Sequence, residues 1–137
     1  MHRKVCDVIA GGDVMEKEGY FVKPTVVRDV ADDARIVREE QFGPILPVLA
    51  YDDVEDALER INDTEYGLGG SVWSSDVGRA TDLARRIDSG TVWVNQHIDL
   101  PFDVPFGGAK QSGIGREKGL DGLAEYAQSK IINVRLG

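Results

Sequence analysis

Apolar and polar positions in the middle of the chain predict a strand followed by a helix. Residues 45–51 form a near-continuous apolar run, which is typical of a strand covered on both faces. After Asp52 or Asp53, residues of a type that caps helices, apolar side chains recur at helical spacing as far as Ile61. We therefore expect a buried strand and then an amphipathic helix.

The same pattern follows once more. A short strand is predicted at residues 71–74, and a second amphipathic helix begins after Ser75 or Asp76. Gly90 ends this helix, and residues 91–94 are expected to form a third strand. Because the order β-α-β-α-β has short connections, it predicts an α/β fold with a three-layer parallel sheet and right-handed crossovers.

The flanking segments give weaker signals. Residues 5–10 are either a brief strand or the last turn of a helix, and residues 19–30 are rich in strand formers interrupted by a proline. We expect short helices within residues 31–38 and 116–125. Residues 98–112 have little periodicity, but their aromatic rings predict an ordered loop rather than a disordered one.

The last segment, residues 126–137, contains a strict alternation of apolar and polar side chains. One face carries Ile132, Val134 and Leu136, and the other carries Asn133 and Arg135. No hairpin partner lies nearby. We therefore expect an extended C-terminal strand that pairs with a distant part of the chain or with another chain.

The turn at residues 39–44 carries the first candidate chemistry. Glu39 and Glu40 precede an aromatic ring, Phe42, and we expect Gly43 to supply a backbone angle that other residues resist. Taken alone, this segment favours a solvated acidic turn with Phe42 in the core. The alternative is a carboxylate that accepts both hydroxyls of a ribose, beside a ring that packs on a flat heterocycle.

Composition and charge limit the classes of function. The 137 residues are enough for one domain with its own core, and the hydrophobic share of 42% is ordinary for a globular protein. A net charge of −8 argues against nucleic acid or an anionic membrane surface as a partner. No apolar run approaches the roughly 20 residues that span a bilayer, and no signal peptide pattern is present.

The sequence has one cysteine, Cys6, so it cannot form an internal disulfide. This fits a reducing compartment, and we expect the protein to be cytoplasmic. The neighbouring residue Asp7 is negative and disfavours the reactive thiolate, so we interpret Cys6 as structural. No metal site is expected.

Several segments together resemble a known family. They are EEQFGP at residues 39–44, GTVWVN at 90–95 and PFGGAKQSGIGRE at 105–117, with supporting matches in GYFVKPT at 19–25 and YGL at 66–68. In this order and spacing they resemble the C-terminal part of the NAD(P)-dependent aldehyde dehydrogenase superfamily, from about residue 10 onward. The resemblance implies a partial catalytic domain at residues 1–125 and an oligomerisation strand at residues 126–137.

The resemblance also implies roles for individual residues. Members of this superfamily bind NAD or NADP, attack an aldehyde with a cysteine and release a carboxylic acid with water activated by a glutamate. Glu40 matches the carboxylate that accepts the hydroxyls of the nicotinamide ribose, and Phe42 matches the ring beside the nicotinamide. The choice between NAD and NADP depends on a domain outside this sequence.

Other matching positions belong to the aldehyde pocket. Phe106 matches a residue of the aldehyde tunnel, and Gln96, Ile98 and Leu100 occupy loop positions that shape the pocket in relatives. For these three loop residues, a loop that packs on itself is an equal alternative. Glu117 matches a buried glutamate assigned to proton relay, for which a structural carboxylate bonded to backbone amides is equally expected. His97 is either a pocket group or a lone surface histidine, and the lone surface histidine is the more usual case.

Cys6 does not match the nucleophile of the superfamily, whose motif lies upstream of every segment quoted above. We therefore expect a C-terminal fragment of an aldehyde-oxidising enzyme that is inactive alone. It would act on a small-molecule aldehyde as part of a homo-oligomer joined by the last strand, without nucleic acid or membrane partners. Alternatives are a non-catalytic module that assembles with full-length subunits and a misassigned start of a complete protein. Neither the aldehyde nor the choice of dimer or tetramer follows from the sequence.

Overall fold

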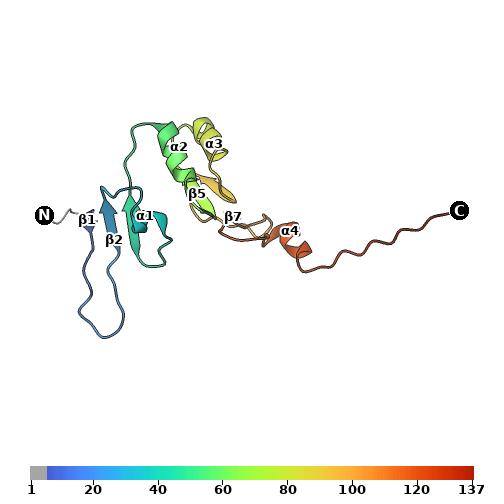
Figure 1. Ribbon diagram of the computed structural model, residues 1–137, viewed down its shortest axis with the longest axis horizontal. Coiled ribbons are helices and arrows are strands. Elements are labelled where there is room, and N and C mark those ends of the chain that lie inside the picture. Colours follow the sequence, from blue (N-terminus) through green and yellow to red (C-terminus); the bar gives the residue numbers. More distant parts are fainter. Residues whose placement is uncertain (1–5) are drawn as a thin grey trace. The chain divides into compact units, whose positions relative to one another are not determined.

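Parallel and antiparallel strands form a sheet in the first of two units into which the chain divides (Figure 1). The computed structural model describes residues 6–137, and the division lies between Arg60 and Ile61. The first sheet consists of β1 (Asp7–Ala10), β2 (Thr25–Arg28) and β3 (Ile45–Val48), in that order. β1 pairs with β2 in antiparallel orientation, and β2 pairs with β3 in parallel. The segment near residue 10 is therefore a strand, not the end of a helix.

Alternate side chains of β2 are buried, as expected for a strand with one covered face. Thr25 and Val27 are only 8% and 2% exposed. The hydroxyl of Thr25 accepts a hydrogen bond from the backbone N–H of Gly12 at 2.9 Å and donates to the carbonyl of Lys23 at 2.8 Å. Because a buried hydroxyl without partners would cost free energy, these bonds fix the hairpin that joins β1 to β2.

β3 is shorter and more exposed than the apolar run at residues 45–51 predicts. Leu46 and Val48 are 59% and 46% exposed, and Tyr51 lies beyond the strand. The prediction that both faces are covered is wrong for the described residues, because the face that carries Leu46 and Val48 is left open. β3 also has a single neighbour in its sheet. Pro47 suits such an edge strand, since it cannot donate to a second neighbour.

Both helices predicted for this part of the chain form. They are α1 (Arg35–Arg38) and α2 (Val54–Asn62). The side chain of Asp53 accepts a hydrogen bond from the backbone N–H of Glu55 at 2.6 Å, so Asp53 rather than Asp52 starts α2. Leu58, within the predicted apolar stripe, is buried, whereas Ile61 at the end of the stripe is exposed.

A strand, a helix and a second strand form the core of the second unit. They are β5 (Gly69–Val72), α3 (Val77–Ala84) and β6 (Thr91–Val94). β5 and β6 are parallel, and α3 lies against both of them. The side chain of Asp76 caps α3 by accepting from the backbone N–H of Arg79 at 2.9 Å. Ala80 and Trp93 are buried in this unit, so the predicted strand-helix-strand order is confirmed.

The remaining elements are short. β4 (Tyr66–Gly67) and β7 (Ala109–Lys110) form a two-stranded antiparallel sheet, and α4 (Gly119–Ala124) is the helix predicted within residues 116–125. The predicted α/β class with parallel strand pairs is thus confirmed, with the described strands arranged in three small sheets. Among residues 6–137, no helix has the length and apolarity needed to cross a bilayer.

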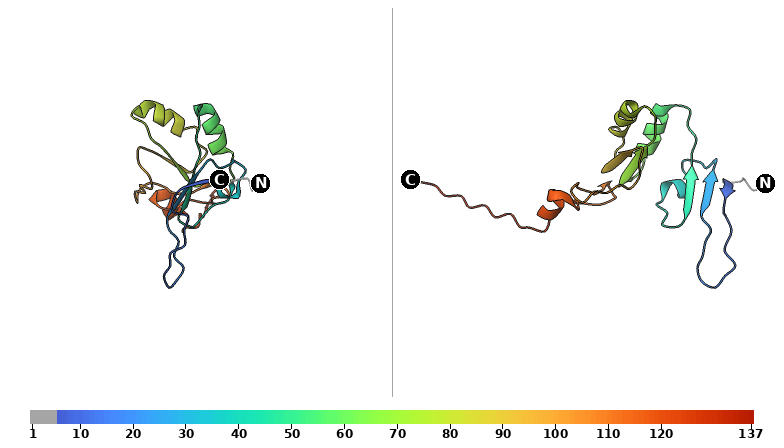
Figure 2. Two further views of the ribbon diagram at one scale, coloured as in Figure 1. Left: turned by 90° about the vertical axis from the view of Figure 1, so that its left-hand side faces the viewer. Right: turned by 180° about the vertical axis from the view of Figure 1, so that it is seen from behind.

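The C-terminal segment follows α4 as an extended trace (Figure 2). Residues 128–137 belong to no helix or strand, and all of them are exposed. The apolar side chains of its alternating face are 76%, 69% and 89% exposed at Ile132, Val134 and Leu136. Its pairing with another strand stays a prediction.

Two glycines of the second unit should respond oppositely to substitution by alanine. A Cβ at Gly90 would clash with the carbonyl oxygen of Gly107, so Gly90→Ala should lower the free energy of unfolding by about 1–3 kcal/mol. Gly78 lies in α3, where a Cβ would come no closer than 3.4 Å to the Asp76 side chain. Gly78→Ala should therefore raise the free energy of unfolding by about 0.5–1 kcal/mol. Urea denaturation measures both, and equal effects would contradict the close approach at Gly90.

Candidate functional site

Glu39 and Glu40 stand together between α1 and β3, but their surroundings differ. Arg35 donates from Nε to Oε1 of Glu39 at 2.7 Å and from Nη2 to Oε2 at 2.8 Å. This hydrogen-bonded ion pair lowers the pKa of Glu39 and raises the pKa of Arg35. The carboxylate of Glu39 is therefore already engaged by the helix that precedes it.

Glu40 is exposed, and its carboxylate has no hydrogen-bond partner within the described part of the chain. The ring of Phe42 is 94% exposed. The expectation that Phe42 fills the core is therefore wrong, because the turn carries its ring outward. One short segment thus presents a free carboxylate and a free aromatic face, which together could accept hydroxyl donors and pack against a flat ring.

Hydrogen bonds from the first sheet hold this turn. The backbone N–H of Thr25 donates to the carbonyl of Pro44 at 2.8 Å, and that of Ile45 donates to the carbonyl of Gly43 at 2.8 Å. Gly43 does not have a positive φ, so the expected special backbone angle is wrong. The turn depends on its pairing with β2 rather than on the conformational freedom of glycine.

The loop after β6 carries the three predicted pocket residues of the second unit. Gln96 and Ile98 are exposed, whereas Leu100 is half-buried and its carbonyl accepts from Nζ of Lys118 at 3.1 Å. Ile98 has a φ of 54°, in the left-handed region. The three residues therefore share one loop, and two of them present their side chains to solvent.

Phe106 and Glu117 are brought together by a pair of backbone hydrogen bonds, each 2.7 Å long. Both residues line a hollow of about 430 Å³. Further residues around it include Leu68, Ile114, Arg116 and Tyr126. Sequence reasoning named two of these residues but could not show that an antiparallel bridge joins them across the glycine-rich loop.

The carboxylate of Glu117 is exposed and accepts no hydrogen bond from the described residues. The alternative interpretation of Glu117, a structural carboxylate bonded to backbone amides, is therefore wrong for the described residues. Its proton relay role stays a prediction.

His97 is not the isolated surface histidine expected from the sequence. Its Nδ1 lies 2.7 Å from Oγ of Ser71, and its ring meets the ring of Trp93 edge-on at 5.7 Å between centroids. Ser71 pairs with Trp93 in the β5–β6 register, so the parallel pairing brings the serine close to the loop that follows β6. Sequence reasoning missed this pair because the register was unknown.

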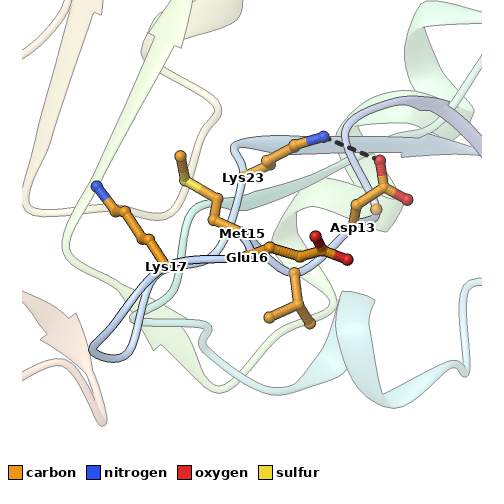
Figure 3. Close-up of a pocket in the computed structure, with 7 residues that line it drawn as sticks. Asp13, Met15, Glu16, Lys17 and Lys23 are labelled. Carbon is orange, nitrogen blue, oxygen red and sulfur yellow. Dashed lines mark hydrogen bonds and ion pairs between the residues drawn. The ribbon is translucent and has the colours of Figure 1, made fainter.

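A second hollow, of about 750 Å³, lies on the hairpin between β1 and β2 (Figure 3). Nζ of Lys23 pairs with Oδ2 of Asp13 at 3.1 Å, and Nζ of Lys17 lies 3.6 Å from the ring centroid of Phe21. None of the predicted site residues lines it. Cys6 is a half-buried free thiol, and within residues 6–137 no three His, Cys, Asp or Glu side chains gather to hold a metal ion.

A family model and individual relatives all place this chain in the same protein family. Residues 2–132 match the aldehyde dehydrogenase family. A betaine aldehyde dehydrogenase from Rhizobium etli is 44% identical over 133 residues, which are 95% of this chain and 27% of that protein. Retinaldehyde dehydrogenase 3 from Homo sapiens is 45% identical over 127 residues, which are 93% of this chain and 25% of that protein. The chain therefore spans about a quarter of the length of these curated relatives.

Solved structures agree. The NAD+ complex of an aldehyde dehydrogenase from Bacillus cereus matches 90% of this chain and 25% of its own, with a TM-score of 0.86 and 46% identity. An indole-3-acetaldehyde dehydrogenase in complex with NAD+ matches 88% of this chain and 25% of its own, with a TM-score of 0.84 and 42% identity.

The pair between Arg35 and Glu39 predicts a titration that can be measured. A lowered pKa in the folded state means that the pair stabilises the fold above the ordinary carboxyl pKa of about 4.5, and that this contribution is lost as the pH falls through the lowered pKa. Arg35→Gln should therefore raise the midpoint of the Glu39 carboxyl in an NMR titration. Arg28→Gln, which removes a comparable cation that pairs with Asp29, should leave that midpoint in place. An unchanged midpoint in Arg35→Gln would contradict the pair.

Proposed function

Because this chain belongs to the aldehyde dehydrogenase family, we propose that it is a C-terminal segment of an oxidoreductase that oxidises an aldehyde to a carboxylic acid with NAD(P)+. This chain covers about a quarter of the length of its relatives, which supports the proposal that it is a segment of a longer enzyme. Similar solved structures are complexes with NAD+, which supports NAD(P)+ as the cofactor. The observation that carries the proposal is the free carboxylate of Glu40, held on a fixed turn beside an exposed aromatic ring.

The residues of the turn fit a nicotinamide ribose. Glu40 would accept the two ribose hydroxyls in charge-assisted hydrogen bonds, and Phe42 would pack beside the nicotinamide ring. Glu39 is unsuited to this task because both of its oxygens are bonded to Arg35. When bound, NAD(P)+ supplies the acceptor for the hydride that leaves the aldehyde carbon.

The second unit would supply part of the aldehyde pocket. Phe106 would line the tunnel, and Gln96, Ile98 and Leu100 would shape its wall. The half-buried side chain of Phe106 and the solvent-facing side chains of Gln96 and Ile98 support this assignment. Glu117 would move a proton near the pocket, which its exposed carboxylate without intramolecular partners permits.

We propose that this chain is inactive by itself, with residues 1–125 forming part of a catalytic domain. The only cysteine, Cys6, matches no nucleophile motif, and removal of a nucleophile costs many orders of magnitude in rate. Many large apolar side chains are exposed, among them Phe42, Tyr20 and Leu46, which supports further sequence or subunits that cover them. The single unpaired cysteine supports a cytoplasmic protein.

The second candidate is a non-catalytic module that assembles with full-length dehydrogenase subunits. The extended and exposed residues 128–137 favour it, because their apolar face and backbone groups are free to join another sheet. In the first candidate, residues 126–137 would serve as the oligomerisation strand of a homo-oligomer. Only the second candidate requires the isolated chain to co-purify with a longer homologous chain.

The two candidates share one prediction about the isolated chain. It should not reduce NAD+ or NADP+ with short or aromatic aldehydes when absorbance at the reduced nicotinamide band is followed. Cys6→Ser should be indistinguishable from the unmodified chain. Turnover that Cys6→Ser abolishes would instead make Cys6 the nucleophile and overturn the assignment.

A second prediction concerns the dehydrogenase that contains this segment. Glu40→Gln should lower kcat/KM for NAD(P)+ by about 10–100-fold, since hydrogen bonds to a charged group contribute about 1.5–3 kcal/mol. The unfolding transition should hardly move, because Glu40 has no partner within the described residues. Glu39→Gln is the matched control and should change kcat/KM for the cofactor by no more than about twofold. Unchanged kinetics in Glu40→Gln would reject the assigned role.

A further inference from the structure

Ile98 adopts a backbone conformation that its side chain disfavours. Its φ of 54° lies in the left-handed region, where a β-branched residue is an outlier. Such a conformation costs about 1–3 kcal/mol and persists only when the surrounding structure holds it. The loop must therefore contain interactions that oppose relaxation at this position.

Two hydrogen bonds flank the strained residue. On one side, Nδ1 of His97 is 2.7 Å from Oγ of Ser71. On the other side, Nε1 of Trp93 donates to the carbonyl of Asp99 at 2.7 Å. Each bond joins a residue adjacent to Ile98 to a strand of the parallel pair, so the loop is fixed directly before and directly after the outlier.

The base of the loop is fixed as well. The side chain of Asn95 accepts from the backbone N–H of Ser74 and donates to the carbonyl of Ser74, both at 2.8 Å. Asn95 is thus bonded to Ser74, two residues beyond the end of β5, His97 is bonded to β5, and Asp99 is bonded to β6. All five residues from 95 to 99 are exposed, but the side chain of Gln96 makes no hydrogen bond to the described residues and that of Ile98 is apolar. Alternate residues are anchored, and the others are left available for contact.

We propose that Ser71 and His97 are positioning residues for aldehyde specificity. Their hydrogen bond holds Ile98 in its left-handed conformation, and this fixes the side chains of Gln96 and Ile98 that face the aldehyde tail. The inference rests on the proposed function for the identity of the ligand. It assigns a role to His97 and Ser71, neither of which touches the reacting atoms.

The hydrogen bond between Ser71 and His97, which we call the clamp, can persist in different protonation states of the imidazole. A serine hydroxyl can donate to a neutral imidazole nitrogen or accept from a protonated one, so either tautomer of His97 keeps the bond. The edge-on contact with Trp93 limits rotation of the imidazole, because Trp93 is itself only 7% exposed. Ser71 also lies inside the paired stretch of β5, opposite Trp93, so the parallel ladder holds the backbone that carries its hydroxyl.

The first test uses the 137-residue chain and the indole proton of Trp93, whose bond to Asp99 reports opening of the loop. Ser71→Ala should accelerate its hydrogen exchange by at least about threefold, the loss expected for one hydrogen bond. Ser71→Thr keeps the hydroxyl and should restore the slow rate. The exposed indole of Trp73 serves as an internal control, and Ser75→Ala as a matched serine substitution. A smaller acceleration in Ser71→Ala overturns the clamp.

A double-substitution cycle tests the link to the strained residue. Asparagine tolerates the left-handed region, so Ile98→Asn should reduce the need for the clamp. The acceleration caused by Ser71→Ala should then be smaller in the Ile98→Asn background than in the unmodified one. Equal accelerations in the two backgrounds overturn the proposal that the clamp holds Ile98 in place.

The last test uses the dehydrogenase that contains this segment. Ser71→Ala should raise KM for hexanal and phenylacetaldehyde about three- to tenfold while kcat and the KM for acetaldehyde change by less than about twofold. A uniform loss of kcat for all three aldehydes overturns the specificity role. If the unmodified long protein oxidises none of them, the proposed function fails, and the Trp93 exchange result alone decides whether the clamp exists.

Discussion

Parallel strand pairing is the constraint on which both candidate segments depend. In the first unit, β2 and β3 pair from Thr25 and Ile45 onward, and Thr25 also bonds to the carbonyl of Pro44. The acidic turn is thereby fixed at the start of β3. In the second unit, β5 and β6 pair in register, and the loop with the predicted pocket residues leaves the end of β6. Without these registers neither segment would have a defined conformation.

The two glutamates show how a neighbouring helix can give identical side chains different hydrogen-bonding states. Both carboxylates are exposed, and their sequence positions are adjacent. Arg35 lies one helical turn before Glu39, so its guanidinium reaches that carboxylate and saturates both oxygens. Glu40 has no such partner among the described residues and keeps its hydrogen-bonding capacity. In the ribose contact that we propose, Glu40 would not have to give up an ion pair with Arg35, because Glu39 already holds that guanidinium.

In the second unit, a strained backbone conformation occurs in the loop that carries the predicted pocket residues. Five residues outside glycine have positive φ in the described chain: Asp29, Asn95, Ile98, Lys110 and Lys118. Asn95 tolerates this region well, but Ile98 does not. The hydrogen bonds of His97 and Trp93 hold the loop at the two residues next to Ile98. Exposed side chains held by an anchored backbone are what a binding surface requires.

Much of the local structure followed from the sequence, because helix caps and apolar periodicity act over a few residues. Asp53 and Asp76 begin α2 and α3, and β6 has the bounds that its four residues predict. The motifs also identified the family and the candidate residues Glu40, Phe42, Phe106 and Glu117. These features depend on residue types and short spacings, which are fully present in the chain itself.

What the tertiary structure decided depends on contacts between distant residues. The exposure of Phe42, the uncovered side of β3 and the bridge between Phe106 and Glu117 required the strand order and the path of the loops. The partner of His97 required the β5–β6 register, since Ser71 is 26 positions away in sequence. A pattern of residue types fixes which elements form, but only the packing of those elements determines which side chains meet and which remain free.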